Sequence, residues 1–292
     1  MSEPIGATPA VSVVIPARDE ASTLPALLWS LQAQTLERER FEVIVVDNDS
    51  SDDTAAVAAG HGAKVVHEPV ANRSRARNRG VAAASAPLYA FTDADCVADP
   101  RWLEALLRCA PSAPLQAGAV EVTVGERPNA LERFELLWRF GQEEWVKQGW
   151  AATANLLVHR EAFDAIGGFD PAWREGGEDA DFCVRAGRAG HALAYCGDAL
   201  VRHYGERRLR PFLRRFFMHG YSVNQARYRL GIGYRAWRHP LPALVGDRAL
   251  RQIGHSPNGF EPEEWRRMAR IARLGYAARV VGSVWAEIVR AR

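Results

Sequence analysis

Two carboxylates, Asp93 and Asp95, are separated by one residue where the apolar run of residues 88–92 (LYAFT) ends. Side chains two positions apart on an extended segment point the same way, so both carboxylates can face one site. Neighbouring negative charges repel unless a cation lies between them, and oxygen ligands suit Mg²⁺ and Mn²⁺. The pair therefore predicts a divalent metal site that would help a diphosphate to leave. A solvated turn is the alternative for such a triplet taken alone.

A second acidic pair, Glu178 and Asp179, follows the glycines Gly176 and Gly177. The pattern after them predicts a helix over residues 178–188, and negative charge at a helix start is favoured by the helix dipole. One interpretation is simple N-terminal capping. The other is a general base that takes a proton from an acceptor hydroxyl.

His203 and Asp47 each end a predicted strand. An imidazole at His203 would complete a metal shell only if the fold brings it near Asp95, and otherwise it is structural. Asp47 begins a run of Asp, Asn and Ser, which is typical of turns. A carboxylate there could also accept a hydrogen bond from a nucleobase N–H.

Four short apolar runs predict the strands that would position these residues, at 11–16, 41–46, 64–67 and 88–92. Helical patterns over residues 24–31, up to 60, and over 73–84 separate them. This alternation predicts an α/β fold, a mostly parallel sheet flanked by helices on both faces. Ligands bind beyond the carboxyl ends of such strands, where residues 17–20, 47–49 and 93–95 lie.

The rest of the chain is less regular. The pattern predicts one amphipathic helix over residues 129–146, an extended segment at 153–159, a turn at Gly167 and Gly168, and short strands at 192–195 and 199–203. Arginine-rich helices are expected at 209–230, 240–253 and 262–290. We therefore expect a catalytic domain over residues 1–205 and a basic α-helical region over 206–292.

Charge is distributed unevenly along the 292 residues. The net charge is +2, yet residues 202–292 hold 19 Arg, no Lys and 6 acidic residues, a balance of +13. Three interpretations of this basic region remain: a helical lid on the catalytic domain, peripheral attachment to anionic lipid, and nucleic-acid binding. The last is disfavoured, because no recognised nucleic-acid-binding fold accompanies the charge.

The lack of a recognisable targeting signal and the pattern of the cysteines favour a cytoplasmic protein. The first ten residues lack a basic and an apolar segment, and no window of 18 apolar residues predicts a membrane span. The four cysteines (Cys96, Cys109, Cys183, Cys196) form no CxxC pair. We expect them to be reduced thiols of the core, and expect the protein in the cytoplasm, with possible peripheral contact to the inner face of the membrane.

In order along the chain, these segments resemble the family 2 glycosyltransferases, which have the GT-A fold. The matching segments are VSVVIPARDEASTLPALLWSL, VIVVDNDSSDDT, ARNRG, FTDAD, ANLLVHREAFDAIGGFDP and GEDADFCVRAGRAG, which together cover roughly residues 11–205.

The resemblance implies a role for each matching residue. The nucleoside pocket is lined by Pro16, Ala17, Arg18 and Glu20, with Asp47 toward the base, Arg77 and Asn78 near the nucleotide, and Asp93 and Ala94 near the ribose. Asp95 binds the metal with Asp93, and His203 completes metal or diphosphate binding. Asp179 is the general base, and Glu178 supports it.

The implied activity is an inverting single displacement. It needs Mn²⁺ or Mg²⁺, a nucleotide-diphosphate sugar with UDP as the default, and a glycan, lipid-linked or small-molecule acceptor. Asp49 stands where the family usually has Gly, so it would have to tolerate left-handed turn geometry. No QxxRW motif is in register near Arg214 and Arg215, which favours single addition over processive synthesis.

Two alternatives to this activity remain. A sugar-1-phosphate nucleotidyltransferase would need a Gly-rich, basic loop after the first strand, and PARDEAST has no glycine. A non-catalytic sugar-nucleotide-binding scaffold would be expected to lack Asp95 or Asp179, and both are present.

Overall fold

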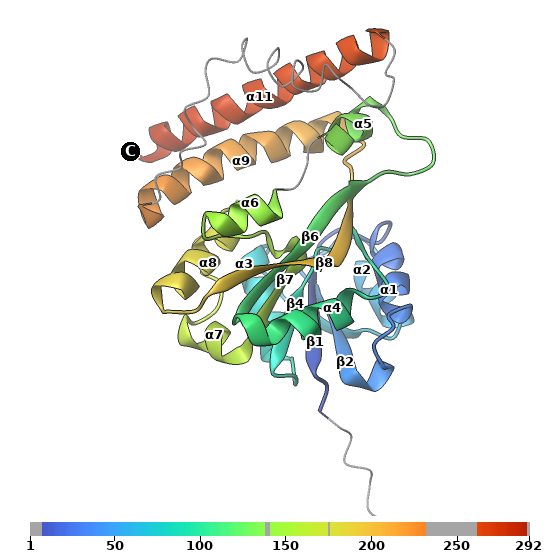
Figure 1. Cartoon of the computed structure of the whole chain (residues 1–292). Coiled ribbons are helices and arrows are strands. Elements are labelled where there is room, and N and C mark those ends of the chain that lie inside the picture. The colour runs from blue at the N-terminus through green and yellow to red at the C-terminus, as the bar shows by residue number, and fades with distance from the viewer. Residues whose placement is uncertain (1–7, 138–140, 175, 232–261, 291–292) are drawn as a thin grey trace, which may run out of the picture. The chain divides into compact units, whose positions relative to one another are not determined.

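The computed structural model describes residues 8–137, 141–174, 176–231 and 262–290. The chain divides into two compact units (Figure 1). We call residues 1–121, 140–174 and 178–203 the catalytic unit, and residues 122–139, 175–177 and 204–292 the helical unit. The helical unit thus draws on three separate stretches of sequence.

The catalytic unit is built on the eight-stranded sheet β3-β2-β1-β4-β7-β6-β8-β5. The strands β1 (Val11–Ala17), β2 (Phe41–Asp47), β3 (Lys64–His67) and β4 (Leu88–Phe91) pair in parallel, as predicted. Their carboxyl ends therefore meet at one edge of the sheet, with Ala17 opposite Asp47.

The other half of the sheet is antiparallel where its register is defined. β7 (Leu156–His159) pairs with β4 and with β6 (Leu115–Thr123), and β5 (Cys96–Ala98) pairs with β8 (Leu193–Tyr204). The two short strands predicted at 192–195 and 199–203 are wrong, because β8 is one continuous strand through Gly197 and Asp198.

Helices cover both faces of the sheet, and each face buries its own apolar cluster. α1 (Leu24–Gln32), α2 (Thr54–Gly60) and α4 (Trp102–Cys109) contribute to one cluster. α3 (Arg73–Ala82), α7 (Arg160–Ala165) and α8 (Glu178–Arg188) contribute to the other. Gly80 lets α3 approach β1, since a Cβ there would lie 2.4 Å from Cγ1 of Val14.

The single helix predicted over residues 129–146 is also wrong. The structure has two helices, α5 (Ala130–Leu137) and α6 (Gln142–Lys147), and they belong to different units. Gly141 has non-helical backbone angles and caps α6, and its weak helix propensity explains why a helical pattern breaks there.

The expectation of four reduced cysteines holds for only two of them. Cys109 and Cys196 form a disulfide, with 6.2 Å between their Cα atoms, whereas Cys96 and Cys183 are free and buried. The fold brings the end of α4 next to β8, a proximity that a sequence separation of 87 conceals. The disulfide removes part of the argument for a cytoplasmic location, since such bonds are rare there.

The helical unit consists of α5, α9 (Leu209–Leu230) and α11 (Pro262–Arg290) in its described part. Phe134 of α5 packs against Phe212 and Phe216 of α9 in its core. The helix predicted at 240–253 lies outside the described residues. Among the helices described, none has a stretch long and apolar enough to cross a bilayer.

Candidate active site

The loops that follow β1 and β2 are tied together by hydrogen bonds from backbone to side chain. Glu20 N donates to Thr54 Oγ1 at 2.8 Å, Ala21 N donates to Asp52 Oδ2 at 3.0 Å, and Ser51 N donates to Asp19 Oδ1 at 2.7 Å. The two predicted nucleoside-binding loops are therefore one connected rim at the carboxyl edge of the sheet.

The four predicted nucleoside-pocket residues lie at the end of β1 and on the loop after it. Ala17 is buried, Pro16 and Glu20 are half-buried, and Arg18 is exposed. Burial raises the pKa of Glu20 to about 7, and the charges of Asp95 and Asp93 add to that rise. Glu20 therefore lies close enough to the acidic pair to sense its charge.

The turn after β2 holds Asp47 and Asp49. Asp47 is almost buried, its Oδ1 accepts from Ser50 N at 3.3 Å, and its Oδ2 lies 3.1 Å from His67 Nδ1. Asp49 adopts a left-handed backbone with φ of 61°, the geometry considered above because the family usually has Gly at this position. Asp tolerates this conformation better than most residues, which explains how it can replace the usual Gly.

The sheet brings His203 to Asp95. β5 begins directly after Asp95, and its antiparallel pairing with β8 places Cys96 opposite His203. His203 Nε2 then lies 3.3 Å from Asp95 Oδ1, and ligand atoms of Asp95, Cys96 and His203 all fall within 4.8 Å of one another. The carboxylate of Asp95 and the imidazole of His203 are donors that fit Mn²⁺ or Mg²⁺. Asp93, the other predicted metal ligand, is not part of this cluster, and its half-exposed carboxylate contacts Arg77.

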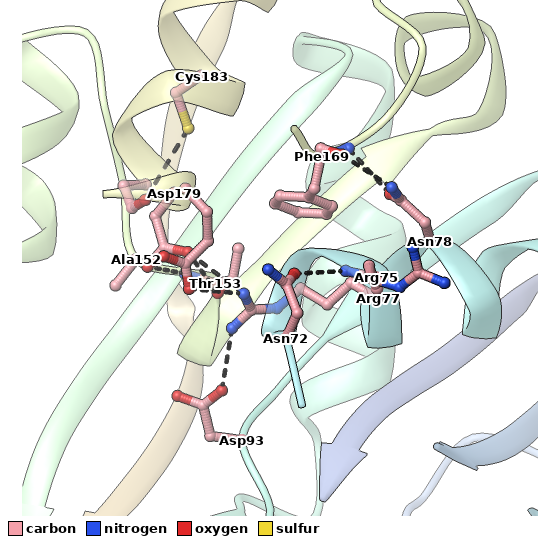
Figure 2. Close-up of polar contacts among 12 residues, drawn as sticks. Asn72, Arg75, Arg77, Asn78, Asp93, Ala152, Thr153, Phe169, Asp179 and Cys183 are labelled. Carbon is pink, nitrogen blue, oxygen red and sulfur yellow. Dashed lines mark hydrogen bonds and ion pairs between the residues drawn. The ribbon is translucent and has the colours of Figure 1, made fainter. Parts of the chain in front are cut away.

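Arg77 joins the two acidic pairs (Figure 2). Its Nη1 lies 3.0 Å from Glu178 Oε1 and 3.6 Å from Asp179 Oδ1, while its Nη2 lies 3.4 Å from Asp93 Oδ1. Only 3% of the side chain is exposed, and the guanidinium stacks on Phe169 at 5.4 Å. Burial alone would lower the pKa of Arg77, but Asp179, Glu178 and Asp93 raise it, so the charge is secured.

Asp179 is held by Thr153 in the orientation drawn in Figure 2. Thr153 Oγ1 donates to Asp179 Oδ1 at 2.8 Å, and the Thr153 backbone N–H donates to Oδ2 at 3.3 Å. Burial and the charge of Glu178 raise the pKa of Asp179 to about 6. A carboxyl group with that pKa is suited to take up a proton during a reaction near neutral pH.

Asn78 is used differently from its neighbour Arg77. Its Nδ2 donates to Phe169 O at 2.8 Å, and its Oδ1 accepts from Phe169 N at 2.9 Å. The amide thereby fixes the backbone that carries the Phe169 ring under Arg77. A nucleotide contact for Arg77 and Asn78 stays a prediction, since the hydrogen bonds described here go to protein groups.

The structure thus gathers Arg77, Asp93, Glu178 and Asp179 into one network, and Asp95 and His203 into a second group beside it. Residues at this site that sequence reasoning missed are Thr153, Cys96 and Phe169. A threonine in a predicted extended segment carries no signal of its own, so only the fold reveals the contact of Thr153 with Asp179.

Comparison with known proteins gives matches among glycosyltransferases. The family model for glycosyl transferase family 2 matches residues 12–169. Glycosyltransferase AglE of Haloferax volcanii is 30% identical over 204 residues, 67% of this chain and 67% of that protein. Pre-mycofactocin glycosyltransferase of Mycobacterium tuberculosis is 35% identical over 259 residues, 82% of this chain. The match spans about half, 51%, of that protein.

A solved structure resembles most of the chain. The mannosyltransferase PcManGT from Pyrobaculum calidifontis, in complex with GDP-Man and Mn²⁺, superimposes with a TM-score of 0.65 at 18% identity. The alignment covers 95% of this chain and 88% of that one, which shows that the two share a fold. With the family model matched over more than half of its residues, the chain belongs to glycosyl transferase family 2.

Proposed function

We propose that this protein is an inverting, metal-dependent glycosyltransferase that moves one sugar from a nucleotide-diphosphate donor to an acceptor hydroxyl. The network around Arg77 is the observation that carries the proposal. One buried guanidinium contacts Asp93 at the predicted donor edge and Glu178 and Asp179 at the predicted base. The residues for donor binding and those for proton removal would thus be held together by the side chain of Arg77.

Asp179 is the proposed general base. Its carboxylate accepts the proton of the acceptor hydroxyl while that oxygen forms a bond to the anomeric carbon. The bond from the anomeric carbon to the diphosphate breaks, and its electron pair leaves with the nucleoside diphosphate. Attack from the face opposite the leaving group inverts the anomeric centre, and no covalent enzyme intermediate is required.

The remaining residues support this step by position and charge. The hydrogen bond from Thr153 orients the carboxylate of Asp179, and Arg77 balances the charge of the neighbouring Glu178. Asp95, His203 and Asp93 would hold Mn²⁺ or Mg²⁺, which when bound supplies positive charge to the leaving diphosphate. The loops around Asp19 and Ser51 would receive the nucleoside, with Asp47 toward its base.

The donor and the acceptor follow from relatives and from family resemblance. UDP is the default nucleotide of the family, and GDP is the second candidate because PcManGT was solved with GDP-Man. A relative named for pre-mycofactocin favours a single defined acceptor, in agreement with the absence of QxxRW in register near Arg214. Glycan and lipid-linked acceptors are the other two classes.

A thermal-shift panel tests the proposal: UDP-, GDP-, dTDP- and CDP-sugars, each with Mn²⁺ and with EDTA. A true donor at 100 times its dissociation constant stabilises the protein by about 2.7 kcal/mol. We expect a shift from one nucleotide family that is lost with EDTA and in Asp95→Ala, but kept in the control Asp164→Asn, an exposed carboxylate of α7. Equal shifts with and without metal would remove the ion from the mechanism.

A further inference from the structure

Cys96 lies against the two residues of the metal cluster described above. Its Sγ atom, a carboxylate oxygen of Asp95 and a ring nitrogen of His203 all lie within 4.8 Å of one another. Because Cys96 stands directly opposite His203 in the antiparallel pair of β5 and β8, both side chains leave the same face of the sheet. The Asp95 side chain is 32% exposed and that of His203 14%, whereas Cys96 is fully buried. The thiol is therefore the innermost member of a group that reaches solvent at Asp95.

The spacing of these atoms suits one shared cation. Protein ligands bind zinc and similar metals at about 2.0–2.3 Å, so two ligand atoms in a tetrahedral shell lie about 3.5 Å apart. His203 Nε2 and Asp95 Oδ1 already have a similar spacing, at 3.3 Å. Because Sγ of Cys96 lies within 4.8 Å of a ligand atom of each, a shift of about 1 Å brings it into the same shell.

An ordinary core cysteine is the alternative for Cys96, since it also belongs to the apolar cluster of α1, α2 and α4. Cys183 is such a residue: it is free and buried, and its Sγ contacts the backbone oxygen of Ala151. Within the part of the chain that the structure describes, Cys183 belongs to no comparable group of metal-binding side chains. The imidazole and the carboxylate beside its sulfur set Cys96 apart from Cys183.

We propose that Cys96 is a protein ligand of the cation that the proposed function requires, beside Asp95 and His203, and that it makes this site prefer thiol-binding metals to Mg²⁺. On binding, Sγ coordinates as the thiolate and its proton passes to solvent. Zn²⁺ and Co²⁺ accept a thiolate, an imidazole and a carboxylate together, whereas Mg²⁺ takes oxygen ligands. The expected order of affinity is therefore Zn²⁺, Co²⁺, Mn²⁺ and then Mg²⁺.

Cobalt spectroscopy tests this ligand directly. The metal-free full chain is titrated with Co²⁺ without thiol reductant, so that Cys109 and Cys196 stay paired and only Cys96 and Cys183 are free thiols. We expect the near-ultraviolet charge-transfer band of a cobalt–thiolate bond, lost in Cys96→Ala and kept in the matched control Cys183→Ala. Thermal unfolding without metal checks that both variants fold. If Cys96→Ala does not fold, the spectra of the parent and of Cys183→Ala decide the question.

Calorimetry separates a metal ligand from a residue that only supports the fold. Cys96→Ala should weaken Co²⁺ binding by at least about 100-fold, the upper end of what loss of an outer-shell partner costs, and should change Mg²⁺ binding by less than about twofold. Equal losses for Co²⁺ and Mg²⁺ would show that Cys96 is structural. Cobalt bound by the parent without a thiolate band, or a band that survives in Cys96→Ala, would also overturn the proposal.

The proposed function is tested apart from this ligand. If a donor stabilises the parent in Mg²⁺ and EDTA removes the shift, a missing cobalt–thiolate band overturns Cys96 as a ligand and leaves the proposed glycosyl transfer intact. If the parent binds no cobalt and its donor shifts do not respond to EDTA, both the thiolate ligand and the metal of the proposed function are wrong.

Discussion

Thr153 Oγ1 donates a 2.8 Å hydrogen bond to Oδ1 of Asp179, which comes 26 residues later in the sequence. Thr153 is buried, and a short 3-10 turn (Thr153–Asn155) ahead of β7 places it under the start of α8. The contact holds the proposed base in one orientation and favours its charged form.

Replacing Thr153 by valine should therefore affect the chemical step more than substrate binding. The shape is kept and one hydrogen bond to a charged group is lost, so kcat should fall by about tenfold with little change in the donor KM. Thr153→Ser should restore most of the rate. If the loss in Thr153→Val were entirely in KM, Thr153 would belong to substrate binding.

The pH profile should report the ionisation of Asp179. Its pKa is raised from 3.8 to about 6, and a general base acts only when it is deprotonated. We expect kcat/KM to rise with pH through a midpoint near 6 and then to level off. In Thr153→Val the midpoint should move higher, because the lost hydrogen bond had lowered the pKa. A parent midpoint near 4 would contradict the assignment of Asp179.

Arg77 should be important for folding as well as for the site. Arg77→Met would leave the buried carboxylate of Glu178 without its cation, and the free energy of unfolding should fall by about 3–5 kcal/mol. Arg79→Met on the same helix changes an exposed arginine, and should stay within about 0.5 kcal/mol of the parent. Denaturant unfolding of both variants checks this, and equal stability would show that the network is not stabilising.

The disulfide makes a separate prediction. Closing a loop of 87 residues restricts the unfolded chain, so Cys109→Ala with Cys196→Ala should lose about 4 kcal/mol of stability. Alkylation in denaturant without reductant should modify Cys96 and Cys183, and the mass should show that Cys109 and Cys196 are unmodified. Four alkylated cysteines under these conditions would show that the pair is reduced.

The parallel half of the catalytic unit could be predicted from sequence because its signals are local. β1, β2, β3 and β4 are apolar runs that end in polar turns, and their carboxyl ends gather Asp47, Asp93 and the loop around Glu20. The helix that begins at Glu178 could be predicted because two glycines precede it and acidic residues, which the helix dipole favours, stand at its start. These assignments needed no knowledge of which segments lie side by side.

The antiparallel half depends on pairing between distant segments, so local patterns could not predict it. His203 reaches Asp95 only because β8 pairs with β5, and Cys196 reaches Cys109 for a related reason. Thr153 shows the same limit, since its partner lies across the fold. The end of α5 and the new start of α6 were missed because the apolar residues of both helices fit one helical pattern.

The stereochemistry of donor hydrolysis tests the central claim most directly. Water can replace the acceptor, so the parent with its α-linked donor should release mainly the β-sugar before mutarotation, as followed by NMR. Asp179→Asn should bind the donor as tightly but release sugar about 10³-fold more slowly. Initial release of the α-sugar, or an undiminished rate in Asp179→Asn, would contradict an inverting displacement with Asp179 as its base.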